Sequence, residues 1–212
     1  EGLEAAITPR SRVLLLNSPS NPTGAVLSQA EVDAIGEVCR RHDLWILSDE
    51  VYADLTFSGR FCSPFDRPQL RERSLAVASI SKSHLLPGFR AGWVAASEQV
   101  VPRLLSVAEA MLFGSQPFLE DALAEALTGH HPEVERFRET LRERALAVVE
   151  AFAGSTHSRV RLPEGGMFLM VDVRATGLNG EQFAWRLLEE EGVVVMPGES
   201  FGLGAAAGHV RV

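Results

Sequence analysis

The chain has 212 residues, which is enough for one large domain or two small ones with a sizeable buried core. Its 20 Lys and Arg residues against 28 Asp and Glu residues give a formal net charge of −8. Without a long basic block, this acidic balance argues against nucleic acid or an anionic membrane as a partner.

No apolar run reaches the ~18 residues of a membrane span, so we expect no membrane association. Cys39 and Cys62 are too few for a disulfide framework and lack metal-ligand spacing, which indicates a reducing, cytoplasmic location. Because the chain begins with Glu1 and stops at Val212 inside an expected strand, we also expect it to be a piece of a longer protein.

The first fifty residues predict a strand, a helix and a second strand. Residues 12–16 (RVLLL) form an apolar run that ends in a cluster of turn-forming residues. Ser28 stands three residues before Glu31, which is a capping-box signature, and apolar residues at helical spacing continue to about His42. A buried-type strand, LWILS, follows over residues 44–48. This order predicts a βαβ unit with parallel strands and a right-handed crossover.

The rest of the chain predicts further strands and helices in two groups. Pro132 suits a first helical position and opens a charged helical pattern that runs to about Phe152. At about 1.5 Å per residue, this helix would span ~30 Å, long enough to bridge two lobes. The boundary falls near residues 130–153, with a large domain over 1–130 and the interdomain helix and a smaller α+β domain over 131–212. The other expected elements are strands over 75–79, 91–97, 159–162, 166–173, 193–196 and 209–212, and helices over 98–113, 117–128 and 180–191.

Polar residues lie where the expected strands of the large domain end. In open α/β sheets, ligands bind beyond the carboxyl ends of the strands, so these residues are candidates for a site. They are Asn21, Asp49, Tyr52, Ser79, Ser81, Lys82 and Arg90. Taken singly, Asn21 fits a turn, Asp49 a helix N-cap and Arg90 a surface ion pair, and a lone lysine is most often solvated. Taken as a set, they point to one shared site.

Five segments of the chain resemble the fold-type I pyridoxal-phosphate enzymes of the class I/II aminotransferase group. They are NSPSNPTG (17–24), SDEVYADL (48–55), SISKSHLLPGFRAGW (79–93), PEGGMFLMVD (163–172) and the closing GHVRV. Several motifs in the family's order and approximate spacing are far more specific than a lone short pattern. The segment LLPGFR departs from the threonine and tryptophan that many members have around the glycine, which affects only the expected packing of this loop.

The resemblance implies a fold-type I α/β structure, with part of a mainly parallel sheet in the large domain and part of a smaller α+β C-terminal domain. It also implies pyridoxal 5′-phosphate as cofactor and Lys82, Asp49 and Tyr52 as catalytic residues. Lys82 would hold the cofactor aldehyde and move the substrate α-proton, and the Asp49 carboxylate would keep the ring nitrogen protonated. Tyr52 and Asn21 would hydrogen-bond the phenolic oxygen of the ring.

The remaining candidates, by resemblance, bind charged groups. Ser79, Ser81 and Arg90 would hold the cofactor phosphate, and Arg211 would bind the substrate α-carboxylate through its planar fork, with Asn21 also on the substrate side. No cluster of His, Cys and acidic residues resembles a metal site.

The function implied is transfer of an amino group between an L-amino acid and a 2-oxo acid, by an enzyme that forms a homodimer when full length. Two alternatives share the cofactor site: a lyase or decarboxylase of the same fold, and the cofactor-binding domain of a transcription regulator. The adjacent His130 and His131 suit capping or solvent. The glycine-rich residues 198–208 do not follow a strand and open a helix as a dinucleotide fingerprint does, and they predict a mobile loop.

Overall fold

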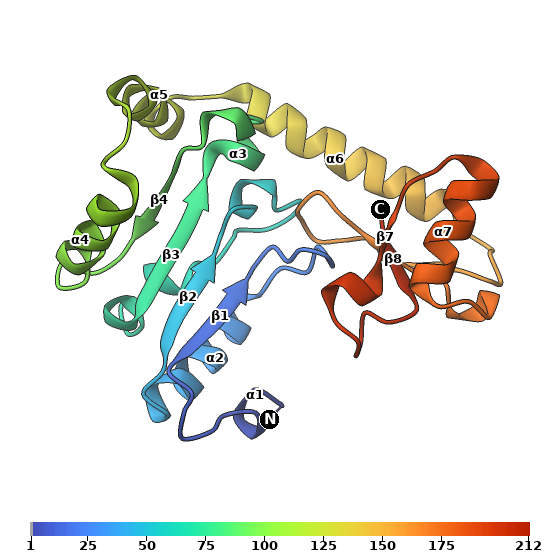
Figure 1. The fold of residues 1–212 in the computed structure, drawn as a ribbon, viewed down its shortest axis with the longest axis horizontal. Helices are drawn as coiled ribbons and strands as arrows, with labels where there is room; N and C mark the ends of the chain where they lie inside the picture. Colours follow the sequence, from blue (N-terminus) through green and yellow to red (C-terminus); the bar gives the residue numbers. More distant parts are fainter. Residues whose placement is uncertain (1) are drawn as a thin grey trace.

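The computed structural model describes residues 2–212, which form two lobes at opposite ends of the molecule (Figure 1). Each lobe is built on a four-stranded sheet, and the long helix α6 runs from one lobe to the other. The strands are β1 (Val13–Asn17), β2 (Trp45–Asp49), β3 (Ser74–Ser79), β4 (Gly92–Ala95), β5 (Arg159–Val160), β6 (Met170–Asp172), β7 (Met196–Pro197) and β8 (His209–Arg211). The α-helices are α1 (Gly2–Ala5), α2 (Gln29–Arg41), α3 (Ile80–Ser83), α4 (Val101–Leu112), α5 (Pro117–Thr128), α6 (Pro132–Ala151) and α7 (Gly180–Glu191). The 3-10 helices are η1 (Ala53–Leu55), η2 (Pro64–Asp66), η3 (Arg71–Arg73), η4 (Pro87–Phe89), η5 (Arg174–Thr176) and η6 (Gly198–Phe201).

The sheet of the large lobe has the strand order β1-β2-β3-β4. β1, β2 and β3 pair in parallel, and β4 pairs antiparallel with β3. The mainly parallel sheet expected for this part of the chain is confirmed. Parallel pairing brings the carboxyl ends of the first three strands to one edge of the sheet, where the polar candidates lie.

Helix α2 covers one face of this sheet. The expected capping box fixes its start, because the Ser28 hydroxyl accepts the Glu31 N–H at 3.3 Å and the Glu31 carboxylate accepts the Ser28 N–H at 2.8 Å. Val32 and Cys39 of α2 pack with Ile46 of β2 in a buried cluster. Full burial of one aliphatic side chain contributes about 1.5–3 kcal/mol, so these contacts hold α2 on the sheet.

The small lobe has the strand order β5-β6-β8-β7, and every neighbouring pair is antiparallel. Val171, Val210 and Ala184 form its core with Ala145 of α6. The expected strand over residues 193–196 is wrong for its first three residues. The ladder with β8 begins only at Met196, and the residues before it are left without strand partners.

Two glycines hold the lobes in close contact. Gly24 has a φ of +69°, and a Cβ atom there would lie 2.7 Å from the carbonyl oxygen of Gly165. The Gly24 carbonyl accepts the N–H groups of Glu164 at 2.9 Å and Gly165 at 3.0 Å. Gly165 also forms an isolated β-bridge with Thr56. A larger side chain at Gly24 would push the small lobe away from the loop that follows β1.

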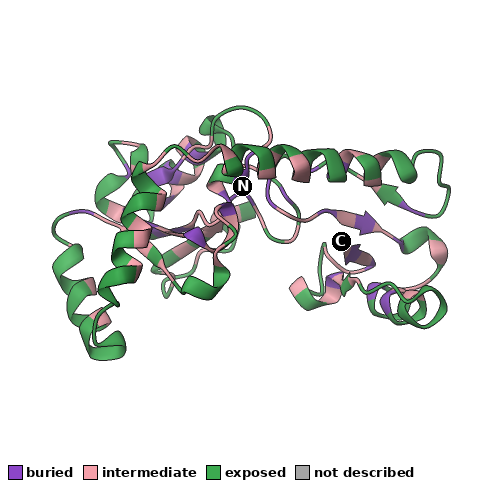
Figure 2. Cartoon of the chain, turned by 90° about the horizontal axis from the view of Figure 1, so that it is seen from above, coloured by how far each residue is buried: buried purple, intermediate pink, exposed green. Residues whose placement is uncertain are grey.

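Helix α6 begins at Pro132, the first-turn proline that the sequence predicts. The preceding His131 does not cap α6, because its Nε2 lies 3.0 Å from the Glu125 carbonyl oxygen in the last turn of α5. His130 is exposed, as expected. Figure 2 shows buried residues gathered in the strands, while the helices are mostly exposed. Within residues 2–212, no helix is both long and apolar enough to cross a membrane.

Candidate active site

The carboxyl ends of β1, β2 and β3 carry three polar residues at one edge of the sheet. Asn17 of β1 is the register partner of Asp49 of β2, and Asp49 is the partner of Val77 of β3. Ser79 lies two residues further along β3. The Asp49 Oδ1 atom accepts the Val51 N–H at 3.2 Å, which leaves Oδ2 without a recorded partner within residues 2–212. The last residue of β2 thus carries a carboxylate with one oxygen that forms no hydrogen bond within the described residues.

Tyr52 lies buried on the turn that follows Asp49. Burial raises the pKa of its phenol above the ordinary value, and the charge of Asp49 raises it further, while the charge of Arg211 acts in the opposite direction. The phenol therefore keeps its proton at neutral pH and serves as a hydrogen-bond donor. Its ring meets the edge of Phe168 from the small lobe, with 5.9 Å between centroids.

Asn21 joins the two lobes. Its Oδ1 atom accepts Arg211 Nη1 at 2.8 Å, across 190 residues of sequence. Its backbone N–H donates to Asn17 Oδ1 at 2.7 Å, which fixes the loop to the end of β1. With its oxygen engaged by Arg211, the Asn21 side chain has its NH₂ group left to donate.

Arg211 stands on β8 among aromatic rings. Its guanidinium carbon lies 4.2 Å from the centroid of Phe168 and 4.8 Å from that of Phe201. Both distances are within the ~6 Å range of a cation–π interaction. The structure therefore brings Asn21, Tyr52 and Arg211 together around Phe168, next to Asp49.

Ser79, Ser81 and Lys82 lie where β3 runs into α3. The Ser79 hydroxyl caps α3 by accepting the Ser81 N–H at 3.3 Å, so its own proton remains free to donate. Lys82 is half-buried, and its amine has no recorded hydrogen bond or ion pair with any of residues 2–212. These three residues lie at the same sheet edge as Asp49, and no hydrogen bond within the described residues joins them to it.

Arg90 lies at the same end of the sheet, two residues before Gly92, the register partner of Ser79. Its backbone has a φ of +53°, its side chain is exposed, and its Nη1 atom donates to the Pro87 carbonyl at 2.8 Å. Within residues 2–212, its guanidinium forms no hydrogen bond with Ser79, Ser81 or Lys82.

Four residues of this region were not predicted from the sequence. Asn17 accepts a hydrogen bond from Asn21, and Phe168 packs against Tyr52. Phe201 lies against Arg211, and Glu199 anchors the loop that carries Phe201. Asn17 and Phe168 lie inside the quoted motifs, so the motif boundaries held a usable signal. Phe201 and Glu199 lie in the glycine-rich loop, where composition suggested mobility only.

The free polar atoms fit the needs of pyridoxal phosphate. A carboxylate oxygen of Asp49 is free to accept from a ring N–H, and the Tyr52 hydroxyl and the Asn21 amide are free to donate to an anionic ring oxygen. The Ser79 hydroxyl offers a donor to a phosphate, and Lys82 offers an amine. The donor set is thus of the kind that the resemblance implies.

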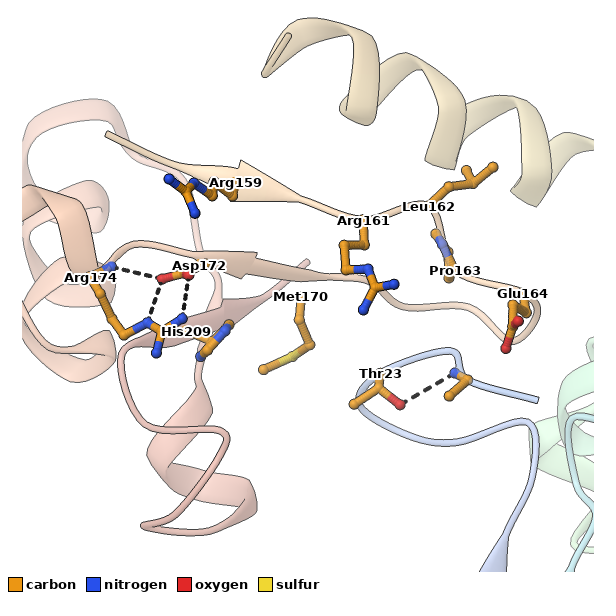
Figure 3. Close-up of a pocket in the computed structure, with 11 residues that line it drawn as sticks. Thr23, Arg159, Arg161, Leu162, Pro163, Glu164, Met170, Asp172, Arg174 and His209 are labelled. Carbon is orange, nitrogen blue, oxygen red and sulfur yellow. Dashed lines mark hydrogen bonds and ion pairs between the residues drawn. The ribbon is translucent and has the colours of Figure 1, made fainter. Parts of the chain in front are cut away.

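A pocket of about 520 Å³ lies beside this site, between the loop after β1 and the small-lobe sheet (Figure 3). None of the eight predicted site residues lines it, although Thr23 and His209 are two residues from Asn21 and Arg211. The Asp172 carboxylate pairs with Arg174 here, and that hydrogen bond holds its pKa well below the ordinary value. The pocket is lined by Thr23, Ala25, Arg159, Arg161, Leu162, Pro163, Glu164, Met170, Asp172, Arg174 and His209.

Within residues 2–212, no group of three or more His, Cys, Asp or Glu side chains is arranged to hold a metal ion. His84 and His131 lie edge to face, with 5.5 Å between ring centroids, and each also meets a backbone carbonyl oxygen of α5. The two rings thus link α3, which carries Lys82, to the end of α5.

Known sequences that are similar to this one match it along its whole length. The model of the family described as aminotransferase class I and II matches residues 1–212. The arginine–pyruvate transaminase of Pseudomonas aeruginosa is 46% identical over 212 residues, which are 100% of this chain and 54% of that protein. An aspartate aminotransferase of Bacillus subtilis is 31% identical over 211 residues, covering 95% of this chain and 53% of that protein. The chain spans about half the length of the curated relatives it matches.

Solved structures match both lobes. The aromatic aminotransferase from Pyrococcus horikoshii OT3 has a TM-score of 0.93 and 31% identity, over 99% of this chain and 57% of that one. The aspartate aminotransferase from Thermus thermophilus with maleate has a TM-score of 0.90 and 32% identity, over 99% and 54%. The fold is therefore that of these fold-type I enzymes. With the family match along all 212 residues, these likenesses establish that the chain belongs to the aminotransferase class I and II family.

Proposed function

We propose that this chain is part of an aminotransferase that moves an amino group between an L-amino acid and a 2-oxo acid. Pyridoxal 5′-phosphate is the cofactor of the family. A donor amino acid leaves as its 2-oxo acid in the first half-reaction, and an acceptor 2-oxo acid leaves as an amino acid in the second. The polar set around the strand ends is the chain's contribution to this chemistry.

The contact between Asn21 and Arg211 is the observation that carries the proposal. It holds a guanidinium from the small lobe 2.8 Å from the large-lobe loop, beside the buried phenol of Tyr52. Amino donors and 2-oxo acceptors share one feature, a carboxylate next to the reacting carbon. A fixed guanidinium binds that carboxylate through two parallel N–H donors and so orients both substrates alike.

Lys82 and Asp49 are the proposed catalytic residues beside that carboxylate site. When bound, the cofactor supplies an electron sink for the negative charge that develops at the substrate α-carbon. The half-buried Lys82 amine would remove the proton from the α-carbon of the donor in the first half-reaction and deliver a proton to the corresponding carbon of the acceptor in the second. The free Asp49 oxygen accepts from the ring N–H, which favours the protonated ring nitrogen.

The other candidates hold the cofactor in place. The Tyr52 hydroxyl and the Asn21 amide donate to the phenolic ring oxygen, with Tyr52 protonated across the neutral range because burial raises its pKa. Ser79, Ser81 and Arg90 bind the phosphate. For Arg90 this requires its guanidinium to exchange the Pro87 carbonyl for the phosphate, a stronger, charge-assisted partner.

The relatives favour transamination over the alternatives. Those named above are a transaminase and aminotransferases, rather than a lyase, a decarboxylase or a regulator. The relative with 46% identity is named for arginine and pyruvate, so we propose this pair as the first substrates to test. We further propose a cytoplasmic homodimer, with the cofactor-binding domain over 1–130 and the helix and small domain over 131–212.

The test is an assay of the full-length protein with added cofactor. Arginine, aspartate and phenylalanine serve as donors, with pyruvate and 2-oxoglutarate as acceptors. We expect the new 2-oxo acid and the new amino acid to appear in equal amounts, and Lys82→Ala to abolish both. Donor consumption with release of CO₂ or ammonia, and no acceptor-derived amino acid, would identify a decarboxylase or a lyase instead. No turnover with any pair, together with specific DNA binding, would identify a regulator.

A further inference from the structure

We propose that Phe201 is a positioning residue for Arg211, and that the loop over residues 198–208 is built to hold it there. This inference rests on the proposed aminotransferase function. The loop connects β7 to β8 and begins with the 3-10 helix η6, of which Phe201 is the last residue. Arg211 is the last residue of β8, and Met196 of β7, just before the loop, is its register partner.

Three contacts fix the guanidinium of Arg211. Phe168 and Phe201 lie 4.2 Å and 4.8 Å from its central carbon, measured to the ring centroids, and Asn21 accepts its Nη1 at 2.8 Å. The rings attract the flat cation and limit its tilt, while the hydrogen bond limits its rotation within the plane. The N–H groups that Asn21 does not use are then aimed in a set direction, ready for a carboxylate.

Glu199 anchors the loop that carries Phe201. Its Oε1 atom accepts the Gly180 N–H and the Gly208 N–H, both at 3.0 Å. Gly180 begins α7 and Gly208 immediately precedes β8, so one carboxylate joins the loop to both elements. A Cβ atom at Gly198 would lie 2.8 Å from the His209 carbonyl oxygen, which shows that the backbone packs closely there. Glu199 therefore ties the start of the loop, where Phe201 lies, to its end at Gly208.

A fixed guanidinium strengthens carboxylate binding because less side-chain motion is lost when the substrate binds. Phe201 reaches Arg211 and does not need to touch the substrate to have this effect. The donor amino acid and the acceptor 2-oxo acid present the same carboxylate to Arg211. Loss of the Phe201 ring should consequently weaken both by a similar factor, whatever their side chains.

The experiment compares Phe201→Leu, Phe201→Tyr and Phe65→Leu in the full-length, cofactor-loaded protein. Leucine keeps apolar bulk but lacks the π face, while tyrosine keeps that face. Phe65 is the matched control, because Arg71 lies 5.5 Å from its ring centroid outside the site. In Phe201→Leu we expect the KM for arginine and the KM for pyruvate each to rise about 3- to 30-fold, with kcat changed by less than about threefold. Phe201→Tyr and Phe65→Leu should stay near the wild-type values.

Three results would overturn the inference. They are unchanged KM values in Phe201→Leu, a change in KM for only one of the two substrates, and a loss of kcat at constant KM. The second result would make Phe201 part of a side-chain pocket, and the third would give it a role in the chemical step. Absence of amino transfer by the wild-type protein would instead overturn the proposed function, and this inference with it.

Discussion

Replacing Arg211 with lysine should weaken the use of every amino donor by a similar factor. The substitution keeps the charge but removes the planar fork, the 2.8 Å hydrogen bond to Asn21 and the contacts with two aromatic rings. A hydrogen bond to a charged group contributes about 1.5–3 kcal/mol, and the ammonium replaces only one of the two donors that a carboxylate would receive. One such bond lost in the transition state corresponds to a fall in kcat/KM of about 10- to 150-fold.

The assay is steady-state kinetics of the full-length protein with a basic, an acidic and an aromatic donor. Arg159→Lys is the matched control, because Arg159 is exposed on the edge strand of the same sheet. We expect similar losses for all three donors in Arg211→Lys and no loss in the control. A loss confined to the acidic donor would show that Arg211 selects the side chain, and the argument for an α-carboxylate site would fail.

Four further predictions concern the lysine, the carboxylates and the isolated chain. Borohydride reduction of the full-length protein with pyridoxal phosphate should attach the pyridoxyl group to Lys82, and peptide mapping to another lysine would remove Lys82 from its role. Asp49→Ala should leave cofactor absorbance detectable while turnover falls by about 100-fold or more; near-normal turnover would exclude Asp49 from the mechanism. The Gly208 N–H lowers the pKa of Glu199 from its ordinary value of 4.5, so the ionised carboxylate stabilises the fold above that pH, and the contribution disappears as pH falls through the lower folded-state pKa. Glu199→Gln should flatten the acid limb of a Tm-versus-pH curve, and identical limbs would contradict this. Residues 1–212 alone should bind a hydrophobic dye and self-associate, because one sheet face exposes Val13 by 56% and Leu15 by 66%. They should also show no turnover above that of free cofactor. Leu15→Glu should reduce dye binding, and a monomeric, active wild-type chain would refute the reasoning.

Much of the fold could be predicted because its signals are local. The capping box at Ser28, the first-turn proline at Pro132 and the apolar runs of β1 to β3 each depend on residues close together in sequence. The start of β7 could not be predicted in this way. Val193 and Val194 favour a strand by their β-branched side chains, but strand structure also needs a partner, and the β8 ladder reaches only Met196.

In the candidate site, too, only the residues placed by local signals could be predicted from the sequence. Asp49 and Ser79 could be placed at one sheet edge from the sequence, because parallel strands align their carboxyl ends. The contact of Asn21 with Arg211 could not, since 190 residues separate them and no local rule sets that distance. Phe168 and Phe201 resemble ordinary core residues in the sequence. Their relation to Arg211 exists only in three dimensions.

The geometry of the proposed carboxylate site therefore depends also on residues that take no part in the chemistry. Arg211 comes from the small lobe and Asn21 from the large lobe, so their 2.8 Å contact requires the lobes to be held at a fixed separation. Gly24 and Gly165 allow that separation, because a Cβ atom at Gly24 would lie 2.7 Å from the Gly165 carbonyl oxygen. A displacement of about 1 Å between reacting groups is enough to lower a rate by about 100-fold. Close backbone packing at Gly24 and Gly165 thus helps to set the position of the Arg211 guanidinium relative to Asn21, although neither glycine can bind a substrate through a side chain.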